Sequence, residues 1–106
     1  VICLSSIDDK KERKNVIKHL KEDGKEIIDI TEKQVNNFAG NMLQVKAANN
    51  EPYLIMSQAA YDSLTVSQVK KIKNHTKVLS SSLETIETCG GGSARCMMAE
   101  VFLPKV

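Results

Sequence analysis

The sequence has few aromatic residues and no tryptophan, with two Tyr and two Phe among 106 residues. This scarcity argues against a surface on which nucleic-acid bases stack. Acidic and basic side chains nearly balance, so the net charge of +2 indicates no strong attraction to nucleic acid or to a membrane surface. The apolar runs are too short to span a bilayer. No signal peptide is recognisable either, because charged residues follow the apolar segment Val1–Leu4 from Asp8 onward.

Histidine and cysteine are also scarce. Neither His19 nor His75 has another His or a carboxylate at metal-binding spacing, so we expect no metal site and no cofactor. The three cysteines are Cys3, Cys89 and Cys96. An odd number without a recognisable secretory segment favours reduced thiols and a cytoplasmic protein. The spacing of Cys89 and Cys96 lacks the Cys-x-x-Cys signature of a redox pair.

The apolar pattern predicts an α/β protein. Strands are expected at 1–5, 25–30, 41–46, 53–56, 77–80 and 97–103, helices at 9–23, 57–64 and 65–75, and short helical turns at 31–34 and 81–87. This order contains one complete ββαβ unit at 41–80 and partial units on either side of it. Because the chain starts inside an expected strand, we expect it to be a piece of a longer protein.

Capping signals define the ends of the expected helices. Ser6 and Asp8 are both candidate N-caps of the first helix, and Gly24 suits the left-handed turn that ends it. Thr65 and Gln68 have the spacing of a capping box, which predicts that a helix begins there. The side of that helix expected to be buried carries Val66, Val69 and Ile72.

The most distinctive stretch is Thr88–Met98, in which three consecutive glycines precede Arg95 and Cys96. Glycine reaches positive φ and allows another group to approach the backbone closely. A flexible turn that places one Cys at the entrance of a strand is one way to build a nucleophile site. The alternative is an ordinary loop in which Cys96 is a small buried hydrophobe, which is the usual fate of a free Cys.

A second unusual stretch is Gln34–Leu43, where three Asn and a Gly surround a single aromatic residue, Phe38. One interpretation is a polar turn, since Asn and Gly are typical turn residues. The other is the rim of a binding site, because an Asn amide both donates and accepts hydrogen bonds. The residues themselves leave both interpretations open.

Gly90–Met97 resembles the C-terminal nucleophile motif of the arginine deiminase and amidinotransferase superfamily, the penteins, which modify guanidino or ureido groups. Asn36–Leu43, Tyr53–Ser57 and Ala60–Leu64 resemble a bacterial branch of arginine-deiminase-related, citrulline-utilising hydrolases. The likeness covers essentially the whole chain. It implies a five-bladed α/β propeller of ββαβ modules with mixed sheets. Residues 1–106 would supply about the last two modules, as the C-terminal portion of a single catalytic domain.

The resemblance also implies a mechanism. Cys96 would attack the central carbon of a guanidino or ureido group, ammonia or an amine would leave, and water would release the product. Asn37 competes with Asn41 for the position nearest the substrate, because this segment can be aligned with the superfamily motif in more than one register. The substrate-binding residues that the resemblance implies are Asn41, Gly91, Gly92 and Arg95.

Two departures from the superfamily pattern shape the expected function. The general-base His of the superfamily lies on an earlier module, and neither His19 nor His75 matches its position. We therefore expect the 106 residues alone to be inactive and to need N-terminal modules of the same protein as partners. Gly90–Ser93 lack the Arg that some arginine deiminases carry in this loop, which argues against free arginine as substrate. Amidino transfer, a non-catalytic structural role and a homo-oligomer stay open.

Overall fold

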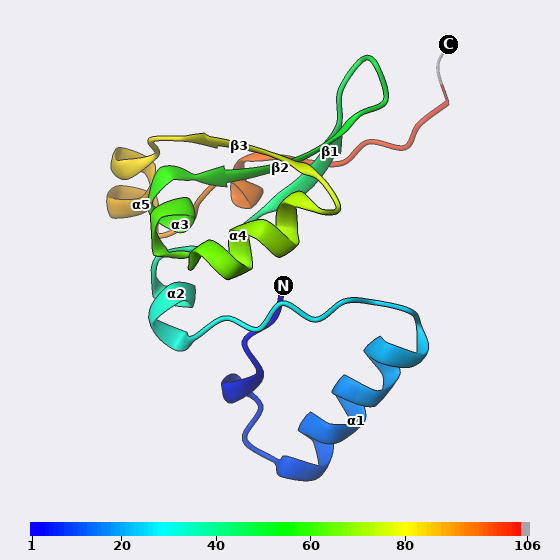
Figure 1. The fold of residues 1–106 in the computed structure, drawn as a ribbon. Helices are drawn as coiled ribbons and strands as arrows, with labels where there is room; N and C mark the ends of the chain where they lie inside the picture. Colours follow the sequence, from blue (N-terminus) through cyan, green and yellow to red (C-terminus); the bar gives the residue numbers. More distant parts are fainter. Residues whose placement is uncertain (105–106) are drawn as a thin grey trace.

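A three-stranded sheet forms the centre of the computed structural model, which describes residues 1–104. The strands are β1 (Leu43–Lys46), β2 (Pro52–Ser57) and β3 (Lys77–Ser81), side by side in that order. β1 and β2 form an antiparallel hairpin, whereas β2 and β3 run parallel (Figure 1). The α/β class, the mixed sheet and the ββαβ unit expected at 41–80 are therefore confirmed.

Two helices connect the parallel strands β2 and β3, because parallel neighbours need a crossover connection. These helices are α3 (Gln58–Ser63) and α4 (Val66–Lys73). The Ser57 side chain caps α3 by accepting a hydrogen bond from the Ala60 amide. Thr65 and Gln68 form both halves of the expected capping box at α4. The start of α4 is therefore where its capping box predicted, and α3 lies within the helix expected at 57–64.

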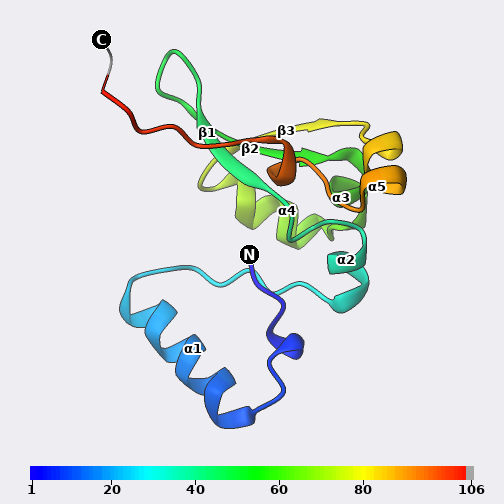
Figure 2. The ribbon, with the colours of Figure 1, turned by 180° about the vertical axis from the view of Figure 1, so that it is seen from behind.

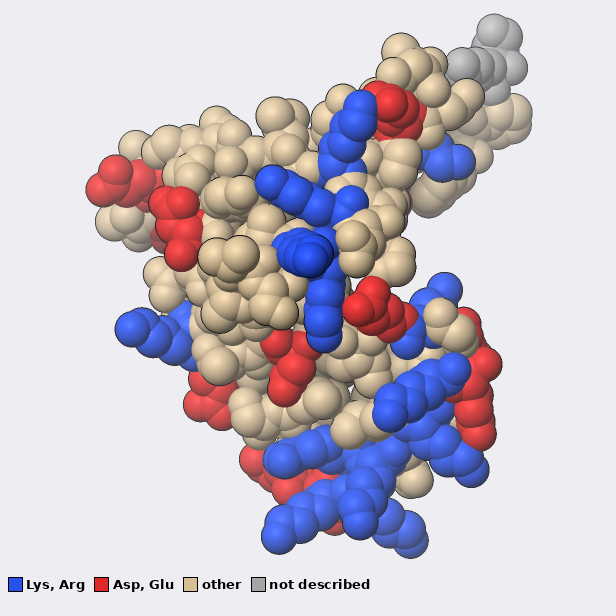
Figure 3. Space-filling view, viewed as in Figure 1, with Lys and Arg blue, Asp and Glu red and all other residues tan. Residues whose placement is uncertain are grey.

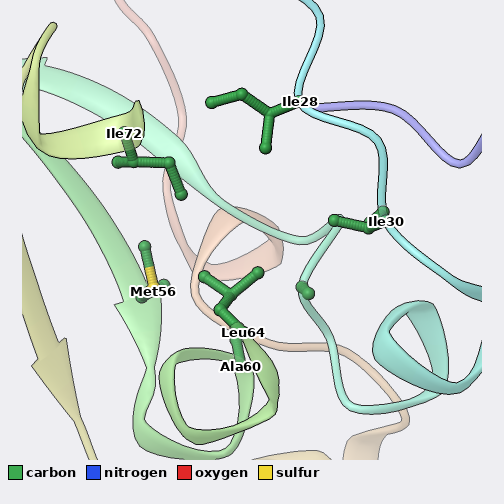
Figure 4. Close-up of a cluster of buried hydrophobic side chains, with 7 residues drawn as sticks. Ile28, Ile30, Met56, Ala60, Leu64 and Ile72 are labelled. Atoms are coloured by element: carbon green, nitrogen blue, oxygen red, sulfur yellow. The ribbon is translucent and has the colours of Figure 1, made fainter. Parts of the chain in front are cut away.

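The hydrophobic core lies between the sheet, the crossover helices and the segment that precedes the sheet (Figure 4). Met56 of β2 is 1 % exposed, and Ile72 of α4 packs into the same cluster. The members of the cluster are Ile28, Ile30, Ala39, Met56, Ala60, Leu64 and Ile72. This cluster fixes the segment 28–39 against the ββαβ unit.

The prediction that Val66 is buried with Ile72 is wrong. Val66 is 88 % exposed, whereas Ile72 is 3 % exposed and Val69 is half-buried against the core. A helix turns by about 100° per residue, so two steps of three residues place Val66 roughly 120° away from Ile72. Val66 thus lies outside the buried stripe of α4.

Two glutamine side chains tie α2 (Glu32–Asn36) to α4. Gln34, which is buried, completes the capping box of Thr31 at the start of α2, in agreement with the helical turn expected there. The Gln34 Nε2 donates to the Gln68 side chain at 2.7 Å and to the Ser63 carbonyl at 2.8 Å. The Gln68 Nε2 donates to the Asp29 carbonyl at 2.7 Å. The side chains of Gln34 and Gln68 therefore connect α2 and α4 to each other, to the end of α3 and to the segment that contains Asp29.

Helix α1 (Lys10–Glu22) lies apart from the sheet (Figures 1 and 2). Its N-cap is Asp9, whose carboxylate accepts from the amides of Lys11 and Glu12, and not Ser6 or Asp8 as expected. Gly24 follows its end at φ +69°, as expected. α1 buries no residue, and Lys and Arg side chains gather over it with acidic side chains nearby (Figure 3). Within residues 1–104, every helix is too short or too polar to cross a bilayer.

The strands expected at 1–5 and 25–30 do not form. These segments share one parallel bridge, between Ile2 and Asp29, and residues Leu4–Ser6 form a short 3-10 helix, η1. The Leu4 amide donates to the Asp29 carboxylate at 3.0 Å. In a longer ladder between the two segments, this amide would bond to a backbone carbonyl instead. The chain consequently turns away after a single bridge.

The prediction of a strand at 97–103 is also wrong. Residues Arg95–Met97 form a 3-10 helix, η2, and the chain then runs in irregular extended form past β1 (Figure 2). Val101, Phe102 and Leu103 are between 73 % and 87 % exposed. A strand needs a neighbour for its backbone groups, and none of the described strands pairs with this segment. The brief helix expected at 81–87 is α5 (Glu84–Gly90), which begins after Leu83 without a side-chain cap.

Candidate functional site

One carboxamide joins the two unusual stretches of the sequence. The Asn41 Nδ2 donates to the Cys96 Sγ at 3.0 Å, although 55 residues separate them in sequence. The Asn41 Oδ1 accepts from the Arg95 amide at 2.9 Å. Asn41 therefore holds the thiol and, at the same time, the backbone of the turn that carries it.

A tight turn between α2 and β1 sets the position of Asn41. Phe38 adopts φ +63°, which is rare for a residue other than Gly, Asn or Asp. The Asn41 amide donates to the Phe38 carbonyl at 2.8 Å, and Ala39 is fully buried inside the turn. The competing residue Asn37 instead donates to the Lys33 carbonyl at the end of α2. The structure thus brings Asn41, and not Asn37, to Cys96.

The glycine loop provides a reversal of the chain and a close approach. Gly91 lies at φ +66° and ends α5, with its amide donating to the Glu87 carbonyl at 3.2 Å. A Cβ atom on Gly92 would lie 3.1 Å from both the Cβ and the Sγ of Cys96. Both properties were expected of this loop. Cys96, however, lies on η2 and not at a strand entrance.

Cys96 is exposed, so the alternative of a buried hydrophobic Cys is wrong. The hydrogen bond from Asn41 is the main cause that lowers the pKa of its thiol. The backbone of Ser93 and the positive charge of Arg95 lower the pKa further, while partial desolvation acts in the opposite direction. These groups favour the thiolate, which is the nucleophilic form of Cys.

The reasoning from sequence missed two residues that support the turn. The Ser93 hydroxyl is fully buried and donates to the Glu87 Oε1 at 2.7 Å. The Ser93 carbonyl accepts from the Cys96 amide at 3.1 Å. The available signal was modest: a Ser between a glycine run and Cys96, and a Glu one helical turn before Gly91.

Both histidines pair with carboxylates away from this site. His75 follows the end of α4, and its Nε2 lies 2.6 Å from the Glu26 carboxylate. The His19 Nδ1 lies 3.6 Å from the Glu22 carboxylate, and both residues belong to α1. Among residues 1–104, no three His, Cys, Asp or Glu side chains group in a way that could hold a metal ion. The site therefore consists of a supported thiol whose neighbours are an amide, backbone groups and one guanidinium.

Comparison with known proteins identifies the family of the chain. A family model described as "N,N dimethylarginine dimethylhydrolase, eukaryotic" matches residues 1–103. No curated protein and no solved structure matches the chain. The match confirms the superfamily that Gly90–Met97 resembles, and it covers nearly all of the chain. The chain therefore belongs to the N,N-dimethylarginine dimethylhydrolase family, whose members are hydrolases of the pentein superfamily.

Proposed function

We propose that this chain supplies the nucleophile of a hydrolase that acts on guanidino groups, with the Cys96 thiolate as the attacking atom. One observation carries the proposal: the Asn41 carboxamide donates to the Cys96 Sγ and accepts from the amide of Arg95, the residue that precedes Cys96. A nucleophile must be accessible and must reach its reactive protonation state near neutral pH. Cys96 is exposed, and its pKa is lowered by its neighbours.

The reaction follows from the chemistry of a thiolate and a planar guanidinium. The Cys96 sulfur forms a bond to the central carbon, and the bond from that carbon to the departing nitrogen breaks. The departing amine leaves with a proton from an acid group. Water then adds to the carbon and loses a proton to a base, and the carbon–sulfur bond breaks to restore the thiolate. The sum consumes one water and releases an amine and a ureido product.

The acid–base group belongs, in this proposal, to other modules of a larger pentein propeller. His19 and His75 pair with carboxylates elsewhere, so neither serves the thiol of Cys96 in this arrangement. We infer that the ββαβ unit described here is one module of the five-bladed propeller and that the 106 residues are inactive without the N-terminal modules.

The substrate proposed first is a dimethylated arginine, because the matching family carries that substrate in its name. Dimethylamine would be the departing group and citrulline the product. Gly91 and Gly92 would let the backbone close around the planar guanidinium, and the exposed Arg95 would pair with the substrate carboxylate. Citrulline itself is the second candidate, because Asn36–Leu43 resembles the citrulline-utilising branch. Transfer to an amine in place of water would use the same thiol.

A non-catalytic role is the alternative from another class. Val101, Phe102 and Leu103 are exposed apolar side chains in one run, and such runs are typical of surfaces that contact another protein part. In that case the chain would act as a structural piece, and the lowered pKa of Cys96 would have no catalytic use.

The test uses the complete polypeptide with three variants of its thiols. The wild type, Cys96→Ser, Cys96→Ala and Cys89→Ser are each incubated with asymmetric dimethylarginine, arginine or citrulline, and the products are identified by mass spectrometry. Cys89 is a matched control, because it is also an exposed free Cys but lies on α5.

Citrulline and dimethylamine from dimethylarginine, lost in both Cys96 variants and kept in Cys89→Ser, is the expected result. Formation of ornithine from citrulline would identify citrulline as the substrate, and Cys96 would remain the proposed nucleophile. Turnover that survives in folded Cys96→Ala would end the proposal and favour the structural role.

A further inference from the structure

Two separate supports hold the turn that carries Cys96. Asn41 holds it from outside the loop, through the Arg95 amide and the Cys96 sulfur. The second support lies within the loop itself, where Glu87 of α5 faces Ser93 across six positions of sequence. The mechanism described above uses the first support and leaves the second without a role.

The Ser93 hydroxyl depends on Glu87. Ser93 is fully buried, and a buried hydroxyl without a hydrogen-bond partner destabilises the structure. Its partner is the Glu87 Oε1 at 2.7 Å, a hydrogen bond to a carboxylate that is shorter and stronger than one between neutral groups. The orientation of Ser93 is therefore set by Glu87.

Ser93 in turn fixes the backbone at Cys96. Its carbonyl accepts the Cys96 amide at 3.1 Å, which is the first hydrogen bond of the η2 turn. Glu87 also holds the other side of the loop, because its own carbonyl accepts the Gly91 amide at 3.2 Å. One residue of α5 thus fixes the glycine loop at its start and just before the thiol.

We propose that Glu87 is a positioning residue for the nucleophile and that it acts through the buried hydroxyl of Ser93. The inference rests on the proposed function of Cys96 as the attacking atom. Glu87 contacts neither the thiol nor the substrate in this proposal; it keeps the thiol where an incoming carbon can reach it. Misplacement of a reacting group by about 1 Å can lower a rate about 100-fold.

Conservative and disruptive variants separate positioning from folding. Glu87→Gln keeps an acceptor oxygen in place, whereas Glu87→Ala removes it. Ser93→Ala removes the hydroxyl from the other side and leaves Glu87, which is half-buried, able to bond water. Glu84→Ala is the matched control, because Glu84 is an exposed carboxylate on the same helix.

Two rates are measured on the complete protein and its variants. The first is turnover of dimethylarginine, with kcat and KM determined separately. The second needs no substrate: the rate at which iodoacetamide alkylates Cys96, followed by mass spectrometry of the Cys96 peptide. Peptide mapping is required because hydrogen bonds from Ser5 and Ser6 also lower the pKa of Cys3. Melting temperatures show which variants are folded.

We expect Glu87→Ala and Ser93→Ala each to lower kcat about 10- to 100-fold with a much smaller change in KM. The double variant should lose no more than the worse single variant, because the two residues act through one hydrogen bond. Glu87→Gln should recover most of the rate, and Glu84→Ala should match the wild type. The alkylation rate of Cys96 should fall in the same order.

Wild-type kcat and alkylation rate in folded Glu87→Ala would overturn the proposal, as would fully additive losses in the double variant. Equal losses in Glu87→Gln and Glu87→Ala would also overturn it, because charge and not position would then matter. If Glu87→Ala does not fold, Ser93→Ala decides by the same criteria. If the wild type turns over no guanidino substrate, the proposed function fails, and the alkylation rates still show whether Glu87 positions Cys96.

Discussion

Replacing Gly92 by Ala tests whether the position of the Cys96 thiol limits the reaction. The new Cβ would lie 3.1 Å from the Cβ and from the Sγ of Cys96. This is closer than an ordinary van der Waals contact, so the Cys96 side chain must give by a few tenths of an ångström. The backbone of Gly92 lies outside the left-handed region and accepts Ala without strain. The substitution therefore acts on the Cys96 side chain and not on the backbone at position 92.

This displacement is large on the scale of catalysis. A reacting group misplaced by about 1 Å can cost a factor of about 100, so we expect the smaller shift in Gly92→Ala to lower kcat about three- to tenfold. Because Cys96 is exposed and can move toward solvent, the protein should keep its fold. The assay measures kcat and KM of the complete protein, with circular dichroism as the check of folding.

Gly90→Ala is the matched control for this prediction. Gly90 belongs to the same glycine run, its Cβ would meet nothing within 4 Å, and its φ also lies outside the left-handed region. Wild-type kcat in folded Gly92→Ala would refute the reasoning. An equal loss in Gly90→Ala would refute it too, because that loss would come from reduced flexibility of the loop and not from contact with the thiol.

Three further substitutions test the site and the fold. Asn41→Ala removes the main donor that lowers the pKa of the Cys96 thiol, so that pKa should rise and the midpoint of Cys96 alkylation by iodoacetamide should move to higher pH; an unchanged midpoint would speak against the role of the carboxamide. Ile72→Ala should lower the free energy of unfolding in urea by about 2–5 kcal/mol because a core side chain is lost, whereas Val66→Ala should change it by less than about 0.5 kcal/mol. Similar effects at the two positions would mean that the burial of α4 differs from that described. Gln68→Ala removes the hydrogen bond to the Asp29 carbonyl and one of the two bonds of the Gln34 amide and should cost about 0.5–1.5 kcal/mol, with the exposed Gln44→Ala as control.

The elements that could be predicted from sequence are those set by local signals. The capping box of Thr65 and Gln68 defines the start of α4, and the Ser57 hydroxyl defines the start of α3. The hairpin of β1 and β2 joins two apolar segments that are near in sequence. In each case a few neighbouring residues contain the physical cause of the structure.

The elements that could not be predicted depend on distant partners. Residues 97–103 have the composition of a strand, yet no described strand pairs with them. The Leu4 amide bonds to Asp29, a carboxylate 25 positions away, and this contact ends the bridge expected to continue as a strand. The turn at Phe38 is equally hard to foresee, because an aromatic residue rarely adopts positive φ.

The candidate site combines both kinds of cause. Cys96 and Asn41 were selected by resemblance to a motif, and their contact spans 55 positions. Glu87 and Ser93 are near neighbours in sequence, yet no motif marks them. The burial of Ser93 and its hydrogen bond to Glu87 are properties of the folded chain, so the sequence alone does not mark this pair.

The two supports of Cys96 differ in how far apart their partners lie in the sequence. The contact between Glu87 and Ser93 is local in sequence, because it joins α5 to the glycine loop that follows it. The contact with Asn41 needs the folded ββαβ unit, because Asn41 precedes β1 and Cys96 follows β3. The main cause that lowers the pKa of the Cys96 thiol is therefore present only when the sheet is formed. In the unfolded chain this hydrogen bond is absent, so the thiol loses the main cause that lowers its pKa and a smaller fraction of it is thiolate near neutral pH.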